Sequence, residues 1–517
     1  MKPTAWASGS LSVASLTLVI VALAMIFCVA SAAGAGISYY VSTSGNDNNP
    51  GTIVSPWHTI QHAANSVIAG DTVFVRAGVY REHINVPVSG NATAGYTTFQ
   101  SYPGETAIVD GTGLDVPDRQ YGLFNINNQS YLIIQGFEIR NYKTSSAKYV
   151  PIGIYVYGAG SNLQILNNHI HNIQASAKGC SANAFGLTVY GTQSPDSINN
   201  LTISGNEIDH LKTGCSETLS VNGNVQYFVI TNNLVHDNNN IGIGAIGFEG
   251  VASRRSKCGS DPCDRARDGQ IAQNTVYRIT SYGNPAYGNQ YAADGIYVDG
   301  GTRIIIERNR IYQVDLGIEM ASEHSGKTTD NIIARNNLIY FGNSAGISVG
   351  GYARSVGGSD RCTIVNNSLL YNDRKNTGSG EFQIQFHATN NVFKNNITYA
   401  TRQGLVINNF TRSEPNPADV DFNVYNSPVG AANANFIWNG KTYTGFAAYR
   451  SSTSKDPDSF FVDPQYVNLT TPDLHAAANS PAVNEGINLG STIVGDVDFA
   501  GTPRVQGSNI DIGAYEQ

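Results

Sequence analysis

One short pattern recurs along most of the chain: apolar-x-apolar-x-Asn-Asn-x-apolar. Examples are "LQILNNHI", "FVITNNLV" and "IIARNNLI". The second Asn of the pattern, or its equivalent, stands at Asn168, Asn206, Asn233, Asn274, Asn309, Asn337, Asn367 and Asn396. Intervals of about 30 residues are typical of stacked repeat architectures, in which each unit needs neighbours to bury its apolar face. The pattern therefore predicts a solenoid.

Each copy alternates apolar and polar positions, which is typical of β-strands, and no long helical periodicity separates the copies. This excludes βαβ units and favours a coil of three short strands per turn, with turns about 4.8 Å apart. An Asn that recurs at the same corner can bond its side-chain amide to the Asn above and below it, and so satisfy polar groups that a tight corner buries. We therefore expect an Asn ladder in a parallel β-helix.

Both ends of the chain support this fold through resemblance. The opening "YYVSTSGNDNNPGTIVSPWHTIQHAANSVIAGDTVFVRAGVYRE" resembles that of secreted right-handed parallel β-helix proteins of the pectate-lyase-like superfamily, and "FVDPQYVN" with "DVDFAGTPRVQGSNIDIGAYEQ" is similar to their C-terminal segment. The resemblance implies an all-β, right-handed single-stranded parallel β-helix of about ten turns. It also implies a short helix near residues 60–67 that caps the first turn.

The N-terminus resembles an export signal. Lys2 precedes an apolar run of small residues that ends near Ala33, and Ala30-x-Ala32 matches a cleavage site. We expect a signal peptide over 1–33, the β-helix with its N-terminal cap over 34–410, and C-terminal β-helix turns with a terminal capping segment over 411–517. The run also has the length of an uncleaved anchor. The protein is expected to be secreted, extracellular or held at the cell envelope, with no other membrane contact.

Charge and cysteine usage narrow the partners. Charged residues make up 14% of the chain and the net charge is −8, without a basic stripe, so no nucleic-acid partner is expected. We expect a monomer. After the signal peptide, Cys258 and Cys263 can close a short loop, and Cys180 can meet Cys215 across neighbouring repeats. Cys362 is left as a buried thiol.

A second strand precedes each Asn pattern, as in "GLTVYG", "GIYVDG" and "GISVGG". The period of two places Ile296 and Val298 in the core and turns Tyr297 and Asp299 outward. The predicted outward set comprises Tyr155, Tyr157, Thr188, Tyr190, Tyr297, Asp299, Glu319, Ser348, Gln383 and Gln385, with Glu323 just beyond its strand. The acidic residues of this region therefore stand on the outer face of one sheet.

The spacing of these acids predicts a catalytic pair. Asp299 and Glu319 fall on adjacent turns and two positions apart, so their α-carbons should lie roughly 7–8 Å apart. Their carboxyl groups can then approach to about 5 Å, the separation found in retaining glycosidases. The expected substrate is a polysaccharide or oligosaccharide. The candidate substrate-binding residues are Asp294, Tyr157, Tyr190, Tyr297, Gln383, Gln385 and His324.

A local resemblance assigns the roles. The segment "GIYVDGGTRIIIERN" followed by "LGIEMASEHSG" is similar to paired motifs of β-helical xylosidases and their fucosidase- or xylanase-like relatives. It implies that Asp299 is the nucleophile and Glu319 the acid/base. The chain departs from the motif, since the interval is compressed, Tyr297 stands where an indole is common and Glu323 is an extra acid. Glu323 therefore remains an alternative proton donor.

Two other functions stay open. Asp294, Asp299, Glu319 and Glu323 offer enough oxygen ligands for Ca²⁺, as in a calcium-dependent polysaccharide lyase that acts on uronates. Lys327, Arg303 or Arg354 would then remove the proton. Without a lyase mechanism, no metal or cofactor is expected. A non-catalytic β-helix that binds glycan or adheres to a surface is the third hypothesis, because fold does not establish chemistry.

Several polar residues are expected to have modest roles. His169, His171, His210 and His236 follow the corner pattern on successive turns, not in a ligand spacing, so we expect surface residues and no metal site there. Glu217 and Glu249 could border the groove, although no motif supports them. The charged stretch 254–268 is expected to be an inserted loop that shapes the cleft.

Overall fold

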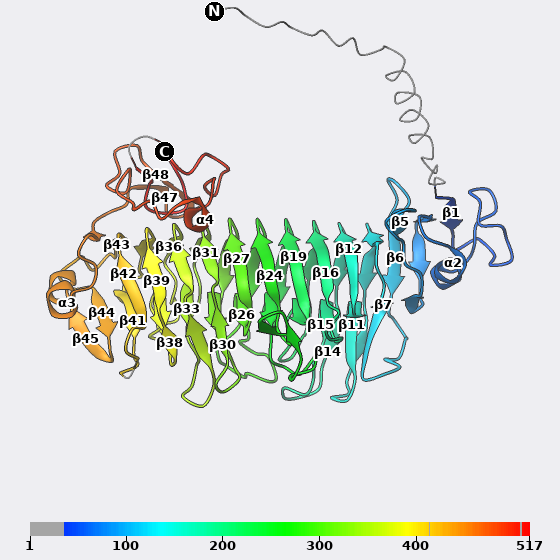
Figure 1. Ribbon diagram of the computed structural model, residues 1–517, viewed down its shortest axis with the longest axis horizontal. Coiled ribbons are helices and arrows are strands. Elements are labelled where there is room, and N and C mark those ends of the chain that lie inside the picture. The colour runs from blue at the N-terminus through cyan, green and yellow to red at the C-terminus, as the bar shows by residue number, and fades with distance from the viewer. Residues whose placement is uncertain (1–35, 413, 507–508) are drawn as a thin grey trace, which may run out of the picture.

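The computed structural model describes residues 36–412, 414–506 and 509–517. The predicted signal peptide, residues 1–33, lies outside the described residues. Among the described helices, none has both the length and the apolar character needed to cross a membrane. The described chain winds into one elongated coil (Figure 1), built from three long sheets whose neighbouring strands are almost all parallel. The predicted parallel β-helix is confirmed.

Sheet I contains the strands that lead into the Asn corner. Its path is β1 (Ser38–Val41), β2 (Thr72–Val75), β5 (Thr97–Ser101), β8 (Leu132–Gln135), β12 (Gly160–Leu166), β16 (Ile198–Ser204), β19 (Val225–Thr231), β24 (Arg267–Ala272), β27 (Thr302–Glu307), β31 (Ile333–Arg335), β35 (Thr363–Val365), β39 (Asn391–Lys394) and β42 (Ala418–Asp421), with β30 (Thr328–Asp330), β34 (Gly358–Asp360) and β38 (Ala388–Thr389) attached. Successive strands of the path come from successive turns of the coil.

Sheet II contains the strands on which the acidic residues stand. Its path is β4 (Ile84–Val86), β7 (Gln120–Asn127), β11 (Val150–Gly158), β15 (Phe185–Gly191), β18 (Leu219–Gly223), β21 (Ile243–Ile246), β26 (Asp294–Asp299), β29 (Leu316–Ala321), β33 (Ile347–Val349), β37 (Phe382–Ile384), β41 (Leu405–Asn409), β44 (Asn435–Trp438) and β45 (Lys441–Thr444). Only the last pair, β44 with β45, is antiparallel, so a hairpin ends this sheet.

Sheet III follows the Asn corner. Its path is β3 (Gly78–Tyr80), β6 (Ala107–Asp110), β9 (Glu138–Arg140), β13 (His169–His171), β17 (Glu207–Asp209), β20 (Leu234–Asn238), β25 (Thr275–Ile279), β28 (Arg310–Val314), β32 (Leu338–Tyr340), β36 (Ser368–Leu370), β40 (Ile397–Tyr399), β43 (Val424–Asn426) and β46 (Phe460–Phe461). Two-stranded pairs β10 (Lys143–Thr144) with β14 (Gln174–Ala175), and β22 (Lys257–Cys258) with β23 (Asp261–Pro262), lie outside the three sheets.

The core runs along the inside of the coil. The predicted inward residues of sheet II belong to one continuous buried cluster, and Ile296, Val298 and Met320 have no exposed surface. Because a parallel strand alternates its side chains, this burial fixes which residues of the same strands point outward. The predicted orientation of Tyr297, Asp299 and Glu319 follows directly.

The Asn ladder is present. Asn309 donates its side-chain amide to Oδ1 of Asn337 at 3.0 Å and to the carbonyl of Ile271 at 2.9 Å. In turn its Oδ1 accepts from both the main-chain and the side-chain N–H of Asn274, each at 3.0 Å. The same arrangement joins Asn168, Asn206, Asn233, Asn274, Asn309, Asn337, Asn367, Asn396 and Asn423. The ladder satisfies buried polar groups at every corner it reaches.

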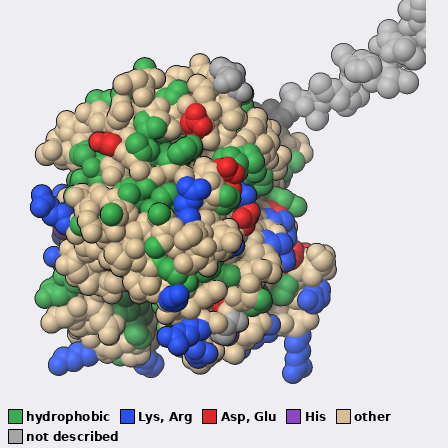
Figure 2. Space-filling view, turned by 90° about the vertical axis from the view of Figure 1, so that its left-hand side faces the viewer, with side chains coloured by type: hydrophobic (Ala, Val, Ile, Leu, Met, Phe, Trp, Pro, Cys, Tyr) green, Lys and Arg blue, Asp and Glu red, His purple; other side chains and the backbone are tan. Residues whose placement is uncertain are grey.

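Both ends of the coil are covered. At the first turn, α2 (Ile60–Ser66) buries Ile60, Ala63 and Ala64, and Thr59 accepts the N-capping hydrogen bond from His62 N, which confirms the expected cap. At the last turns, α3 (Phe446–Thr453) packs Phe446 and Tyr449 into the core. Figure 2 views this end, where hydrophobic side chains lie among polar and charged ones.

The C-terminal segment returns along the outside of the coil. It includes β47 (Tyr466–Asn468), β48 (Asp473–Ala476) and α4 (Ser491–Val494), which lie above β43, β36 and β31 toward the left end of the coil in Figure 1. Ala514 and Tyr515 pack against Leu338 and Leu370 of sheet III. This end of the chain is therefore packed onto the outer face of sheet III.

The cysteine predictions are confirmed. Cys180 is bonded to Cys215 and Cys258 to Cys263, while Cys362 is a buried free thiol. The first disulfide joins loops of neighbouring turns, and the second closes the inserted loop.

Candidate functional site

A pocket of about 870 Å³ lies on the outer face of sheet II. It extends from β7 to β26, about 24 Å at roughly 4.8 Å per strand. Its lining includes Arg119, Tyr121, Asn125, Tyr155, Tyr157, Tyr190, Glu217, Glu249, Tyr287, Tyr297, Asp299 and Glu323. The volume is within the range of about 300–1,000 Å³ for small-molecule sites, and the elongated outline suits a chain-like ligand.

Tyrosine rings form much of the floor. Tyr155 stacks on Tyr157 with ring centroids 4.5 Å apart, and Tyr190 meets the edge of Tyr155 at 5.8 Å. These rings form a small apolar cluster with Val150, Ile152 and Phe185 outside the main core. Tyr157 and Tyr190, both predicted to contact substrate, therefore present aromatic surface to the pocket.

The acidic end of the pocket is built by β26 and the loop after β29. Asp299 is 2% exposed and its Oδ1 accepts a hydrogen bond from the main-chain N–H of Glu323 at 2.9 Å. The Tyr297 hydroxyl donates to Glu323 Oε1 at 3.3 Å. Tyr297 is 4% exposed and packs with Ile241, so it positions Glu323 more than it offers a free ring face.

Glu319 lies one turn further along the coil. Tyr297 pairs with Glu319 and Asp299 with Ala321, so Asp299 and Glu319 form the expected diagonal pair. Glu319 is absent from the pocket lining, however, and its Oε1 accepts a hydrogen bond from Gln385 Nε2 at 2.7 Å.

The remaining predicted substrate-binding residues also lie outside the pocket lining. Asp294, Gln383 and Gln385 do not line the pocket; Asp294 is 2% exposed, and Gln385 also donates to Ser348 Oγ at 2.6 Å. His324 contacts the pocket indirectly, since its Nε2 lies 3.1 Å from Glu249 Oε1. The structure thus brings Asp299, Glu323 and the tyrosines together in the pocket. Glu319 and Gln385 are hydrogen-bonded to each other outside the pocket lining.

Burial and mutual repulsion raise the pKa values of these carboxyl groups. Burial raises the pKa of Asp299 well above its usual range, and the charge of Glu323 adds to the effect. Burial likewise raises the pKa of Glu319 to about 7 and that of Glu323 above its ordinary value. Asp294 has its pKa raised by burial and then by the charge of Glu319. Closely spaced carboxylates of this kind share protons near neutral pH.

Glu217 and Glu249, which the sequence indicated could border the groove, both line the pocket, although no motif marks them. Burial raises the pKa of Glu217 to about 7, with further contributions from Glu249 and Glu323. Glu217 stands two residues before inward Leu219, as Asp294 stands two before inward Ile296, so an alignment on the inward positions gives Glu217 the support that a motif does not. Glu249 lies in a loop, and no periodicity marks it.

The possible cation ligands that the structure brings together differ from the set that the sequence suggested. Ligand atoms of Glu249, Asp299 and His324 lie within 4.8 Å of one another. Their donor set would suit a divalent ion. The calcium set expected from sequence was Asp294, Asp299, Glu319 and Glu323, of which only Asp299 belongs to this group.

The candidate lyase bases are engaged elsewhere. Arg303 pairs with Asp268 at 2.6 Å and with Asp261 at 2.8 Å. Lys327 lies 5.2 Å from the centre of the Phe248 ring, and the Arg354 guanidinium lies 5.0 Å from that of Phe386. Among the described residues that line the pocket, Arg119 is the cationic one, near the end opposite Asp299.

These observations define a class: a right-handed β-helix protein with an acidic, tyrosine-lined pocket on one sheet. Residues 39–200 match the sequence model "Pel9A-like, right handed beta helix region". The chain is 37% identical over 469 residues to the uncharacterized protein YwoF of Bacillus subtilis (strain 168). The alignment covers 90% of this chain and 96% of YwoF. The chain belongs to the same family of β-helix proteins as YwoF.

Two further similarities are more distant. Pectate lyase PEL9 of Emericella nidulans is 30% identical over 173 residues, which is 30% of this chain and 40% of PEL9. The crystal structure of pectate lyase Pel9A superposes with a TM-score of 0.50 at 15% identity and covers 94% of this chain and 98% of that chain. This likeness shows the fold alone.

Proposed function

We propose that the protein is a carbohydrate-active enzyme, a glycoside hydrolase that acts on an oligosaccharide or polysaccharide chain. The observation that carries the proposal is the pocket on sheet II, where Asp299 and Glu323 lie together at one end of a tyrosine-lined surface. Hydrolysis of a glycosidic bond needs two carboxyl groups, one of which is protonated. Burial and the neighbouring charges raise the pKa of both Asp299 and Glu323, which favours retention of a proton by the pair.

The geometry favours Glu323 over Glu319 as the proton donor. Glu323 lines the pocket, whereas Glu319 lies one turn further along the coil than Asp299 and accepts a hydrogen bond from Gln385. Asp299 is proposed as the nucleophile. Protonation of Glu323 removes the neighbouring charge that opposes ionisation of Asp299, whereas burial, the larger cause of the raised Asp299 pKa, remains. The tyrosines would hold sugar units along the coil axis on the side of the lower-numbered turns. A retaining mechanism is part of this proposal.

Kinetics of three variants test the roles. Asp299→Asn should abolish glycan hydrolysis. Glu323→Gln should lose roughly 10²–10⁴-fold in kcat on a natural glycan and much less on an aryl glycoside, because a good leaving group needs no proton. Glu319→Gln should keep most activity. The control Glu485→Gln changes an exposed acid outside the pocket. Full activity of Asp299→Asn would refute the proposal, and loss of activity in Glu319→Gln alone would return the donor role to Glu319.

A lyase is the second candidate, and the similarity of this chain to pectate lyase PEL9 favours it. The matched family region ends at residue 200, before the carboxylates of β26 and β29. The products separate the two reactions, since β-elimination leaves a carbon–carbon double bond that absorbs ultraviolet light and hydrolysis leaves none. An ultraviolet-absorbing product whose release stops with a chelator would establish the lyase and refute the hydrolase.

A further inference from the structure

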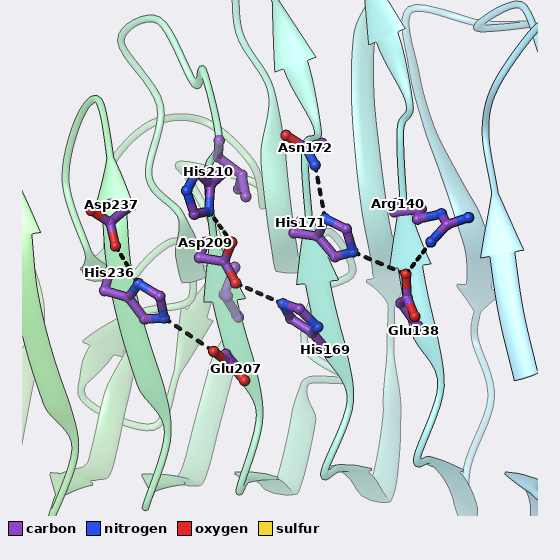
Figure 3. A network of polar contacts seen from close by, with 12 residues as sticks. Glu138, Arg140, His169, His171, Asn172, Glu207, Asp209, His210, His236 and Asp237 are labelled. Atoms are coloured by element: carbon purple, nitrogen blue, oxygen red, sulfur yellow. Dashed lines mark hydrogen bonds and ion pairs between the residues drawn. The ribbon is translucent and has the colours of Figure 1, made fainter. Parts of the chain in front are cut away.

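A cluster of histidines and carboxylates lies on sheet III, away from the pocket on sheet II. We name it the sheet III histidine cluster; it comprises His169, His171, Glu207, Asp209, His210 and His236 (Figure 3). His169 and His171 come from β13, Glu207 and Asp209 from β17, and His236 from β20. The proposed reaction on sheet II uses none of them.

Register brings these residues together. His169 pairs with Glu207, His171 pairs with Asp209, and Asp209 pairs with His236 on the next strand. Neighbouring strands are about 4.8 Å apart, so residues on successive turns are direct neighbours in space. The expectation of no metal site rested on spacing along the chain, whereas in this coil residues from different turns can be ligands of one ion.

The contacts converge on the two carboxylates of β17. His169 Nε2 lies 2.7 Å from Asp209 Oδ2, while His210 contacts the other oxygen of Asp209. His236 Nε2 lies 3.2 Å from Glu207 Oε1. Ligand atoms of His169, Glu207 and Asp209 all lie within 4.8 Å of one another.

An ion fits between these three side chains after a small adjustment. Zinc–nitrogen and zinc–oxygen distances are about 2.0–2.2 Å, so two ligand atoms of one ion are at most about 4.2 Å apart. The Glu207 side chain is 45% exposed and is held by His236 Nε2 at 3.2 Å, so a rotation toward His169 would lengthen or break this one contact. His210 and His236 would then orient the two ligand carboxylates, as residues behind metal ligands commonly do.

Charge balance supports a cation at this position. Arg140 pairs with Asp110 and Glu138, and Arg278 pairs with Asp237. Among the described residues, Glu207 and Asp209 have ion pairs with histidines only. Two neighbouring carboxylates without a lysine or arginine partner are a favourable place for a divalent ion.

We propose that His169, Glu207 and Asp209 bind a divalent transition-metal ion such as Zn²⁺. One imidazole and two carboxylates suit zinc, nickel or copper, whereas Ca²⁺ and Mg²⁺ prefer oxygen ligands alone. The ion would join β13 to β17 and so link two successive turns. Its role would be to stabilise the coil without taking part in the chemistry on sheet II.

Calorimetric titration of Zn²⁺ into the untagged, chelator-treated protein tests the proposal. Wild type should bind Zn²⁺ and gain melting temperature, and His169→Ala and Glu207→Gln should each weaken binding at least ~10-fold and lose the gain. His475→Ala is a matched control, because His475 and Asp473 form an exposed pair at 2.5 Å outside the cluster. This control should bind Zn²⁺ like wild type.

Two results would overturn the proposal. One is wild-type affinity in both His169→Ala and Glu207→Gln. The other is loss of binding in His324→Ala alone, which would place the ion in the pocket with Glu249 and Asp299. Circular dichroism checks that each variant is folded. The test does not depend on the activity of the pocket, so its outcome is independent of the proposed hydrolase function.

Discussion

Neutralising Glu319 should stabilise the protein at neutral and alkaline pH and leave its stability almost unchanged in acid. Burial raises the pKa of Glu319 from 4.5 to about 7. In the unfolded chain the carboxyl group ionises near its ordinary value, so between these two pH values the folded state binds more protons than the unfolded state. Stability therefore falls as pH rises through this window and stays lower above it.

The size of the effect follows from the shift. A tenfold change in acidity corresponds to 1.36 kcal/mol, so the ionised Glu319 destabilises the fold by about 3 kcal/mol above neutral pH. The Glu319→Gln variant removes this cost and keeps an oxygen that can accept the hydrogen bond from Gln385 Nε2. With an unfolding entropy of about 2.1 cal/mol/K per residue over roughly 480 residues, the expected gain is about 3 °C.

Thermal melts of wild type and variant at a pH of about 4 and about 8 measure this difference. The melting temperatures should agree in acid and differ by about 3 °C in base, with Glu319→Gln the more stable. Glu485→Gln, at an exposed position, serves as the control and should show no such divergence. An equal difference between wild type and Glu319→Gln at both pH values would refute the argument from burial.

Three further changes test the fold and the pocket. Asn309→Ala removes four hydrogen bonds of the ladder and should lower stability by about 3–4 kcal/mol in thermal melts; a loss no greater than that of the exposed Asn433→Ala would contradict a structural role for the ladder. Tyr190→Ala should raise KM about tenfold with little change in kcat, since a ring that only binds sugar lowers no barrier; a fall in kcat at constant KM would exclude a binding role. Replacing Cys180 and Cys215 by Ser opens a link across 35 residues and should cost about 3–4 kcal/mol of stability. It should also weaken glycan binding, because both cysteines line the pocket; unchanged affinity in a titration would show that the loops hold their shape without the bond.

The fold could be predicted because its repeat is visible residue by residue. The Asn pattern and the alternation beside it each describe a local requirement that the coil satisfies. The cap helix near residues 60–67 was expected only from the resemblance of the N-terminal segment, and the structure has it at Ile60–Ser66. The rule extends to Asn423, which continues the ladder beyond the predicted set. The C-terminal helix α3 carries no repeat, and its role in covering the last turn emerges only from the packing of Phe446 and Tyr449.

The site could be predicted only in part. Alternation placed Tyr157, Tyr190 and Asp299 on the outer face, and the register of β26 with β29 is the expected one. Alternation does not predict how far an outward side chain is buried by its neighbours. Tyr297 points outward yet is covered by Ile241 and Ala321. The loops that close the pocket are irregular, so Arg119 follows no periodic rule and was found only in the three-dimensional structure. Glu249 was expected to border the groove without a motif to support it, and the structure places it in the pocket lining.

Gly244 shows why the register of a solenoid carries chemical information that spacing along the chain does not. A glycine inside a strand weakens it and brings no side chain to pack. Here Gly244 pairs with Ser220 on one side and Tyr297 on the other, in the outward row of sheet II. A β-carbon at this position would lie 2.8 Å from Cγ of Glu217. The missing side chain therefore makes room for Glu217 in the pocket, just as residues from separate turns meet in the sheet III histidine cluster. On such a fold, candidate functional groups are identified from the strand register, which shows which residues of successive turns are neighbours.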